Sequence, residues 1–282
     1  MNENYLNLHE KREFGDVISA IFLFLKQNLG RIFKILIIYV APFALLYGIS
    51  SSIGSYKILS SIGNGNALDP FANFNSAILL SYVFMFLSYT MVYGVILEYM
   101  KLYQAEGPQF NLSRVGTELM KDTRKILWTS FIVGLLTVVG FIFFLIPGIF
   151  LGVCFSLVLS IRIFENISLG DALGRSFKLI KNNWWWTFLI LFIVGLIAGV
   201  LQMVFGIPVT IYQGISALHM TQNGGMELNQ PLMILLYTIA SLGTVMLQTL
   251  PIMGIAFQYF NLVEEKESAN LLKELETIGG NE

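Results

Sequence analysis

The chain has 282 residues, of which 55% are hydrophobic and only 12% are charged, and its formal net charge is −1. Soluble domains carry about 25% charged residues, so this chain has too few charges to coat a water-exposed surface, and lipid must solvate part of it. The near-neutral balance argues against a nucleic-acid partner, which needs a basic field, and the single cysteine, Cys154, excludes an internal disulfide framework and a cysteine-based metal site.

The first segment, residues 1–14, is polar and carries both signs of charge. It lacks the apolar core of a signal peptide, so no cleaved secretory signal is expected. A short amphipathic helix is predicted next, starting at Phe14, with Val17, Ile21 and Leu25 on the face opposite Lys26. Two further stretches, starting at Leu112 and at Leu169, have apolar residues in the same phase. Such helices are too polar to span a bilayer and are expected to lie in its headgroup region. A cytoplasmic collar that binds a partner is the alternative.

Six stretches are long and apolar enough to cross a bilayer, which takes about 20 residues. They cover residues 32–53, 77–102, 126–145, 147–164, 185–212 and 231–262. The third and fourth are separated only by Ile146-Pro147-Gly148, which predicts a tight hairpin of antiparallel neighbours. Pro208 and Pro251 are expected to kink the last two spans.

The basic residues fall on one side of this topology. With the N-terminus inside, every Lys and Arg except Lys57 lies in an inner-side segment. Basic residues concentrate on the cytoplasmic side of membrane proteins, so both termini are predicted to be cytoplasmic, in the bacterial inner membrane.

The pattern also repeats. Gly15, Asp16 and Phe22 match Gly170, Asp171 and Phe177 at a fixed offset of 155 residues. We therefore predict one all-α transmembrane domain, residues 1–282, as a six-helix bundle of three parallel repeats. Each repeat has an interfacial amphipathic helix followed by two spans, in residues 14–103, 112–164 and 169–262. A charged cytoplasmic tail, 263–282, follows, with Leu271, Leu272 and Leu275 on one side of a short helix.

Charged groups inside a membrane are costly and usually functional. Glu98, Arg162 and Glu165 come closest, near the inner ends of spans, and Arg162 and Glu165 can pair at i,i+3. An interfacial ion pair closing the bundle, with Arg175 or Lys101 as further partners, is the structural interpretation. A lipid-headgroup or ion site that includes Asp171 and Arg175 is the functional one.

Other polar residues suggest packing more than chemistry. Gln202 and Gln248 are expected to bond across helices, with substrate contact as the alternative. The pairs Gly195/Gly199 and Gly148/Gly152 form GxxxG motifs that favour close helix contact. His9 and His219 fall on opposite sides of the membrane and are expected to be solvated. No nucleotide loop, metal site or catalytic group is recognisable, so no cofactor is expected.

The order of Ile146-Pro147-Gly148, Glu165 and then residues 172–186, which include Arg175 and Lys181, resembles the glycerophosphodiester phosphodiesterase membrane-domain family. The resemblance covers about residues 112–212 and implies a bacterial polytopic membrane protein. The phosphodiesterase domain of that family's fused members is absent, so no enzymatic activity is implied. The opening residues 14–34 look like stand-alone Bacteroidota membrane proteins encoded near MoxR-type AAA ATPases, which implies a subunit of a membrane assembly.

Three functions are compatible with this sequence. The first is a non-enzymatic scaffold or complex subunit in contact with lipids and other membrane proteins, and this is the one expected. The second is a transporter or channel for a lipid or other apolar solute. The third is an enzyme acting on lipid headgroups, which would need a polar cluster at Glu98, Arg162 and Glu165.

Overall fold

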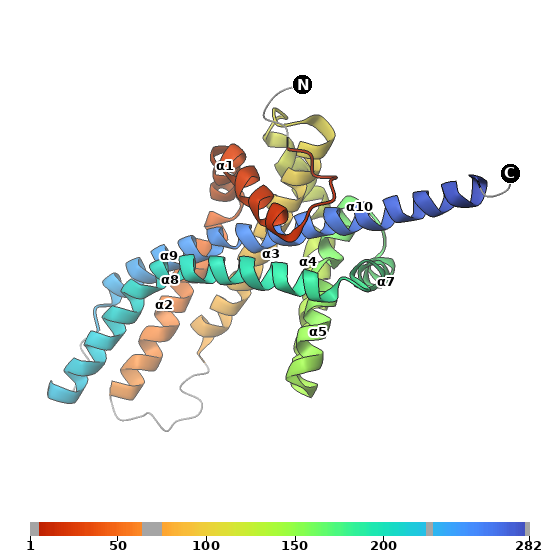
Figure 1. The fold of residues 1–282 in the computed structure, drawn as a ribbon. Helices are drawn as coiled ribbons and strands as arrows, with labels where there is room; N and C mark the ends of the chain where they lie inside the picture. The colour runs from red at the N-terminus through yellow and green to blue at the C-terminus, as the bar shows by residue number, and fades with distance from the viewer. Residues whose placement is uncertain (1–5, 64–74, 224–227, 280–282) are drawn as a thin grey trace. The chain divides into compact units, whose positions relative to one another are not determined.

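The computed structural model describes residues 6–63, 75–223 and 228–279, and these residues form helices and no strand (Figure 1). The all-α prediction is confirmed. The helices, in chain order, are α1 (Phe14–Tyr39), α2 (Ala41–Gly63), α3 (Ser76–Glu106), α4 (Ser113–Phe143), α5 (Leu145–Ser156), α6 (Val158–Phe164), α7 (Leu169–Ile180), α8 (Trp184–Asn223), α9 (Gln230–Leu247) and α10 (Thr249–Gly279).

Five stretches of the described chain are long and apolar enough to cross a membrane, and the number is six if α1 and α2 form one broken crossing. These helices indicate a multi-pass membrane protein. The five stretches are Ser76–Glu106, Ser113–Phe143, Leu145–Phe164, Trp184–His219 and Gln230–Glu267.

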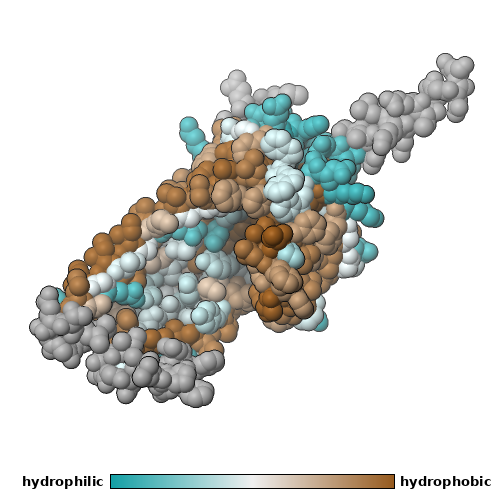
Figure 2. All heavy atoms as spheres, turned by 60° about the horizontal axis from the view of Figure 1, so that its bottom comes forward, coloured by the Kyte–Doolittle hydropathy of each residue, from teal (hydrophilic) through white to brown (hydrophobic). Residues whose placement is uncertain are grey.

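Lipid must cover much of this surface. Only 17% of the apolar 18-residue window is buried in protein in each of the stretches that contain α4 and α8. Phe131 and Phe192 are each about half exposed, and Ile142 is 74% exposed. Figure 2 shows hydrophobic residues over much of the drawn face, with hydrophilic ones gathered in patches. Water would penalise so many exposed large apolar side chains, whereas acyl chains would not.

The chain divides into two compact units. Unit 1 comprises residues 1–32, 94–195 and 250–282, and unit 2 comprises residues 33–93 and 196–249. The sequence of unit 2 contains four charged residues, Lys34, Lys57, Asp69 and Glu227. Nearly all the charge therefore belongs to unit 1, and the polar contacts described below lie there.

Within unit 2, α2 packs closely against α9 because Gly48 has no side chain. A Cβ at Gly48 would lie 2.7 Å from the Thr238 Cα and 2.9 Å from the Tyr237 carbonyl oxygen. Ser241 adds a hydrogen bond from its hydroxyl to the Ala44 carbonyl, at 2.8 Å. A small residue on one helix thus admits the backbone of the other, as in many membrane helix pairs.

The first predicted span, residues 32–53, contains a helix break. Helix α1 continues without a break past residue 32 to Tyr39, and the chain bends there by 58° into α2. Pro42 explains the position of the break, because its nitrogen cannot donate to the carbonyl four residues earlier and its ring crowds the preceding turn. The expected helix start at Phe14 is confirmed.

The α4–α5 hairpin is tighter than predicted. The connection is the single extended residue Phe144, with φ −165° and ψ 150°. Ile146, Pro147 and Gly148, expected to form the turn, lie instead in the first turn of α5. Proline is tolerated there because the first N–H groups of a helix have no intrahelical partner. The predicted contact between the two helices is confirmed.

Each predicted amphipathic stretch buries one side in protein and leaves neighbouring apolar side chains exposed. In α4, Leu119 is 3% exposed and the adjacent Met120 is 77% exposed. In α7, Ile180 is buried while Phe177, expected on the same face, is 40% exposed. Part of the apolar face of each helix therefore packs against protein, and the exposed part is free to contact lipid. Only α7 is a separate short helix, since α1 and α4 continue into longer ones.

Pro208 and Pro251, both expected to kink a span, lie at different kinds of position. Pro208 lies within α8, which is helical on both sides of it. Pro251 lies in the first turn of α10, just after the interruption at Gln248 that ends α9. The second proline therefore follows a helix boundary, where its missing N–H costs nothing, instead of kinking a helix interior.

We predict that Gly148→Ala lowers the melting temperature of the detergent-solubilised protein. The new Cβ would lie 2.8 Å from the Phe141 Cα, a backbone atom, so the hairpin must open at a cost of about 1–3 kcal/mol. Gly152→Ala is the matched control, because its Cβ would meet only the Thr137 Cγ2 at an ordinary 3.8 Å. Equal melting temperatures for the two variants would contradict this packing.

Candidate functional site

Glu165 is the centre of an ion-pair cluster that joins three parts of unit 1. It follows α6 directly, and its Oε1 accepts from Arg175 Nε on α7, at 3.1 Å. The same oxygen accepts from the Tyr259 hydroxyl on α10, also at 3.1 Å. Arg175 also reaches Glu267 of α10, at 3.4 Å. We call Glu165, Arg175, Tyr259 and Glu267 the Glu165 cluster.

Arg175 supplies the permanent positive charge of the cluster. Burial lowers the pKa of Arg175, but the hydrogen bond that Arg175 donates to Glu165 and the charge of Glu165 outweigh that effect, so the pKa is raised. An arginine whose pKa is raised stays protonated at every physiological pH. Through Glu165 it holds α7 against the end of α6.

Glu165 pairs with Arg175 and not with Arg162. Helix α6 ends at Phe164, and Asn166 takes a left-handed conformation with φ 52°, which turns the chain toward α7. Asparagine tolerates this conformation at helix ends. The expected pair between Arg162 and Glu165 does not form, while the expected pairing of Glu165 with Arg175 does.

Arg162 instead anchors α6 to α4. Its guanidinium donates to the Lys125 carbonyl at 3.4 Å, to the Ile167 carbonyl at 3.4 Å, and to the Thr129 hydroxyl. Thr129 is fully buried, so these bonds satisfy polar groups that would otherwise lie in an apolar environment. Arg162 therefore has a structural role, because backbone carbonyls accept its hydrogen bonds.

Glu98 lies apart from the Glu165 cluster, on α3. Its side chain is 0% exposed, and neither carboxylate oxygen has a hydrogen-bond partner among the described residues. Its ion partner is Lys101, 3.6 Å away on the next turn, and Asp122 of α4 is near enough to interact with it electrostatically. Glu98, Arg162 and Glu165 thus have different partners and do not share one site.

Asp171 has a local role in the structure. The Ser168 hydroxyl caps α7, accepting from the Asp171 N–H at 3.2 Å and donating to the Asp171 carboxylate at 2.6 Å. Side-chain capping satisfies the first N–H groups of a helix, and an acidic residue in the first turn suits its dipole. Asp171 therefore fixes the start of α7, the helix that carries Arg175.

Gln202 and Gln248 belong to unit 2. Among the residues that the structure describes, neither side chain makes a hydrogen bond. The expected cross-helix role stays a prediction for both. Another glutamine, Gln213 of α8, donates to the Tyr237 hydroxyl of α9 at 2.5 Å.

The two GxxxG motifs differ in how closely their glycines are packed. A Cβ at Gly195 or Gly199 would meet no atom within 4 Å, whereas Gly148 is in close contact with its neighbours.

His9 is bound, contrary to the expectation that it is solvated. Its Nδ1 lies 2.7 Å from Glu264 Oε1, its Nε2 lies 2.5 Å from Gln104 Nε2, and its ring meets Phe260 edge to face at 4.8 Å. These contacts hold the N-terminal segment against α10. Separations of 95 and 255 residues in the sequence gave no local signal for them. His219 is exposed, as expected.

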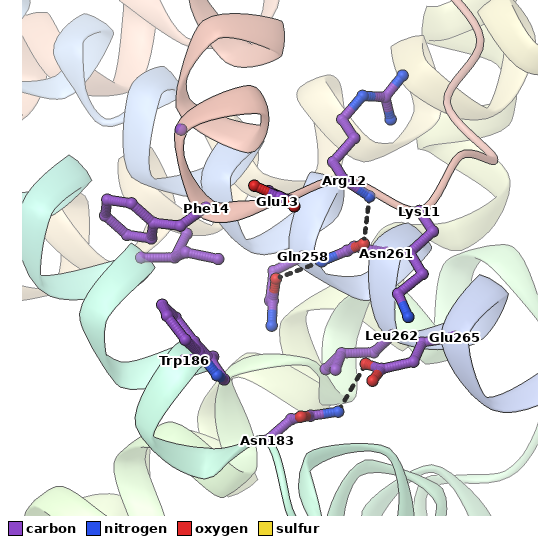
Figure 3. Close-up of a pocket in the computed structure, with 12 residues that line it drawn as sticks. Lys11, Arg12, Glu13, Phe14, Asn183, Trp186, Gln258, Asn261, Leu262 and Glu265 are labelled. Carbon is purple, nitrogen blue, oxygen red and sulfur yellow. Dashed lines mark hydrogen bonds between the residues drawn. The ribbon is translucent and has the colours of Figure 1, made fainter.

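The N-terminal segment also forms one wall of a pocket of about 440 Å³ within unit 1 (Figure 3). The other walls come from the start of α8 and from α10. The lining residues are Lys11, Arg12, Glu13, Phe14, Gly15, Asn183, Trp186, Ile190, Gln258, Asn261, Leu262 and Glu265. Sequence reasoning missed this site because its walls come from three distant segments. The nearest sequence signal was the run Trp184–Trp186.

Hydrogen bonds within the lining hold the pocket's shape. The Arg12 N–H donates to Asn261 Oδ1 at 2.8 Å, and Asn183 Nδ2 donates to Glu265 Oε2 at 2.7 Å. Gln258, 1% exposed, donates to the Thr187 hydroxyl of α8 at 2.9 Å. The N-terminal segment and the start of α8 are thus both bonded to α10, which fixes the pocket before any ligand arrives.

No family model matches the chain, and no curated protein or solved structure matches it.

We predict that Glu165→Gln destabilises the protein more than Glu267→Gln does. Glu165 is 23% exposed and accepts from Arg175 and from the buried Tyr259, whereas Glu267 is 58% exposed and makes one longer contact. Loss of a part-buried charged acceptor costs about 1–3 kcal/mol, and an exposed pair contributes under about 1 kcal/mol. Thermal unfolding in mild detergent measures both. An effect of Glu267→Gln as large as that of Glu165→Gln would contradict the central place of Glu165.

Proposed function

We propose that this multi-pass membrane protein is a non-enzymatic scaffold or subunit of a membrane complex in the bacterial inner membrane, with both termini in the cytoplasm. One observation carries the proposal: α10 changes character along its length. Its residues from Leu250 to Val263 are largely buried in unit 1. Glu264, Glu265, Lys266 and Glu267 follow, and the helix continues to Gly279.

The C-terminal half of α10 extends past α7 (Figure 1). A helix of about 15 residues is marginal in water without tertiary contacts, so a protein partner would stabilise it. The side chains of Leu271, Leu272 and Leu275 lie outside the described residues. The sequence alone places them on one side of this helix, where they could contact another helix.

The orientation and the partner class come from the sequence. The distribution of basic residues supports a cytoplasmic location for the charged half of α10. A cytoplasmic helix suits a soluble partner as well as a membrane one. The resemblance of residues 14–34 to proteins encoded near AAA ATPases makes an ATPase-associated assembly the first partner to test.

The threefold repeat and the family resemblance are part of the same proposal. In support of the repeat, α1, α4 and α7 begin at Phe14, Ser113 and Leu169, within a residue of the predicted starts. Helix α7 precedes two of the candidate crossings, whereas α1 and α4 each form part of the first crossing of their repeat, if α1 and α2 contribute one. Membership of the glycerophosphodiester phosphodiesterase membrane-domain family is proposed on the motif in residues 146–186 alone.

A transporter or channel for a lipid or other apolar solute is the second candidate. The pocket between the N-terminal segment, α8 and α10 favours it, because its lining is amphiphilic and it lies where α8 begins its apolar stretch. A scaffold can also hold a lipid. The two functions therefore differ in their protein partners and not in lipid binding.

We predict that the tagged protein, purified from its native membrane in mild detergent, brings a partner protein in stoichiometric amount. Deletion of residues 268–282 should remove that partner while leaving the melting temperature of the membrane part unchanged, because the buried half of α10 ends before Glu264. Lys57→Gln, in unit 2, is a control variant that should retain the partner. A full-length protein that comes alone with a defined lipid would contradict the scaffold and favour the transporter.

A further inference from the structure

The pocket of unit 1 has a buried floor and a charged rim. Ile190, Gln258 and Leu262 form its floor and are at most 2% exposed. The rim carries Lys11 and Glu13, both exposed, and Glu265, which is partly buried. A cavity of about 440 Å³ is in the usual range for a small-molecule site.

Opposite charges on the rim are available to a ligand. The side chains of Lys11 and Glu13 make no hydrogen bond or ion pair with the described residues. Arg12, by contrast, is occupied: its guanidinium pairs with Glu10 at 2.5 Å, lies over Phe257, and points away from the pocket (Figure 3). The pocket therefore offers one free cation and a free carboxylate to a group that carries both signs.

Aromatic rings line the side of the pocket next to the apolar part of α8. The Phe14 and Trp186 rings lie 6.3 Å apart, and Trp186 is 57% exposed. Tryptophan at the start of an apolar span marks the headgroup level of a bilayer, and its ring face attracts ammonium groups. A ligand here would have its polar part at the rim and its apolar part against these rings and the acyl chains beyond.

We propose that this pocket binds the headgroup of a zwitterionic, ethanolamine-type phospholipid, with Lys11 facing the phosphate and Glu13 and Glu265 facing the ammonium. The shared chemistry is a phosphate ester that carries a primary ammonium group. A phospholipid satisfies both the charged rim and the aromatic side, whereas soluble glycerophosphoethanolamine would use the rim only. A purely anionic headgroup leaves Glu13 without a partner, and a purely cationic ligand leaves Lys11 without one.

Native mass spectrometry of the delipidated full-length protein tests the proposal, with phosphatidylethanolamine, phosphatidylglycerol and phosphatidylcholine of identical acyl chains. Phosphatidylethanolamine should bind about tenfold more tightly than the other two, because each charge-assisted contact contributes about one order of magnitude. Equal binding of phosphatidylglycerol or phosphatidylcholine would overturn the assignment. Glycerophosphoethanolamine should bind far more weakly. Should it bind as tightly as the lipid, a soluble ligand would replace the membrane lipid and overturn the proposal.

The double variant Lys11→Gln, Glu13→Gln should lose this preference, by about tenfold in affinity. Neither side chain has a partner to lose, so the melting temperature should not change. The matched control is Lys26→Gln, Asp16→Asn, which changes the same charges at exposed positions of α1 outside the pocket. Trp186→Leu is a second pocket variant. It should bind the lipid more weakly, because it removes a ring from the aromatic side of the pocket. Retained preference in both pocket variants would overturn the proposal.

The proposal does not rest on the scaffold function. Partner recovery in the pull-down depends on residues 268–282, while lipid preference depends on Lys11, Glu13 and Trp186. A negative result for partner recovery therefore leaves the lipid-binding result interpretable, and the reverse also holds.

Discussion

A hydrocarbon environment offers a peptide group no hydrogen-bond partner, and the rest of this structure follows from that constraint. Every described element is a helix, in which backbone groups pair internally. The same constraint explains why Arg162 and Glu165 of unit 1 are matched so closely. Arg162 bonds to carbonyls and a buried hydroxyl, and Glu165 accepts from Arg175 and Tyr259. Such groups would be costly in an apolar environment without these partners.

Unit 1 concentrates the chemistry of the molecule around α10. His9, Glu165 and Asn183 come from three distant parts of the chain, and each bonds to an α10 side chain. The helix therefore organises the ion-pair cluster, the N-terminal segment and the pocket together, and then continues as a charged helix. A single element that both closes the unit and extends beyond it suits a protein that connects lipid, membrane core and partner.

The sequence predicted what depends on local pattern. Apolar length located the crossings, and amphipathic phase located the starts of α1, α4 and α7. Details set by three-dimensional packing were missed. Ile146-Pro147-Gly148 reads as a turn, yet proline is also at home in a first helical turn, and the connection is Phe144. Arg162 and Glu165 have helical spacing, but Arg162 bonds to carbonyls and to Thr129 and Glu165 pairs with Arg175. The pocket and the His9 contacts join distant segments, which no periodicity reveals.

The central claim is a multi-pass chain whose charged unit faces the cytoplasm. Thiol labelling in intact cells tests it most directly, in a Cys154→Ser background with a single cysteine at Lys57→Cys or at Lys178→Cys, both exposed positions. The account predicts that a membrane-impermeant maleimide labels the first variant in intact cells and the second only after permeabilisation. Labelling of the Lys178→Cys protein in intact cells, or protection of the Lys57→Cys protein, would contradict it.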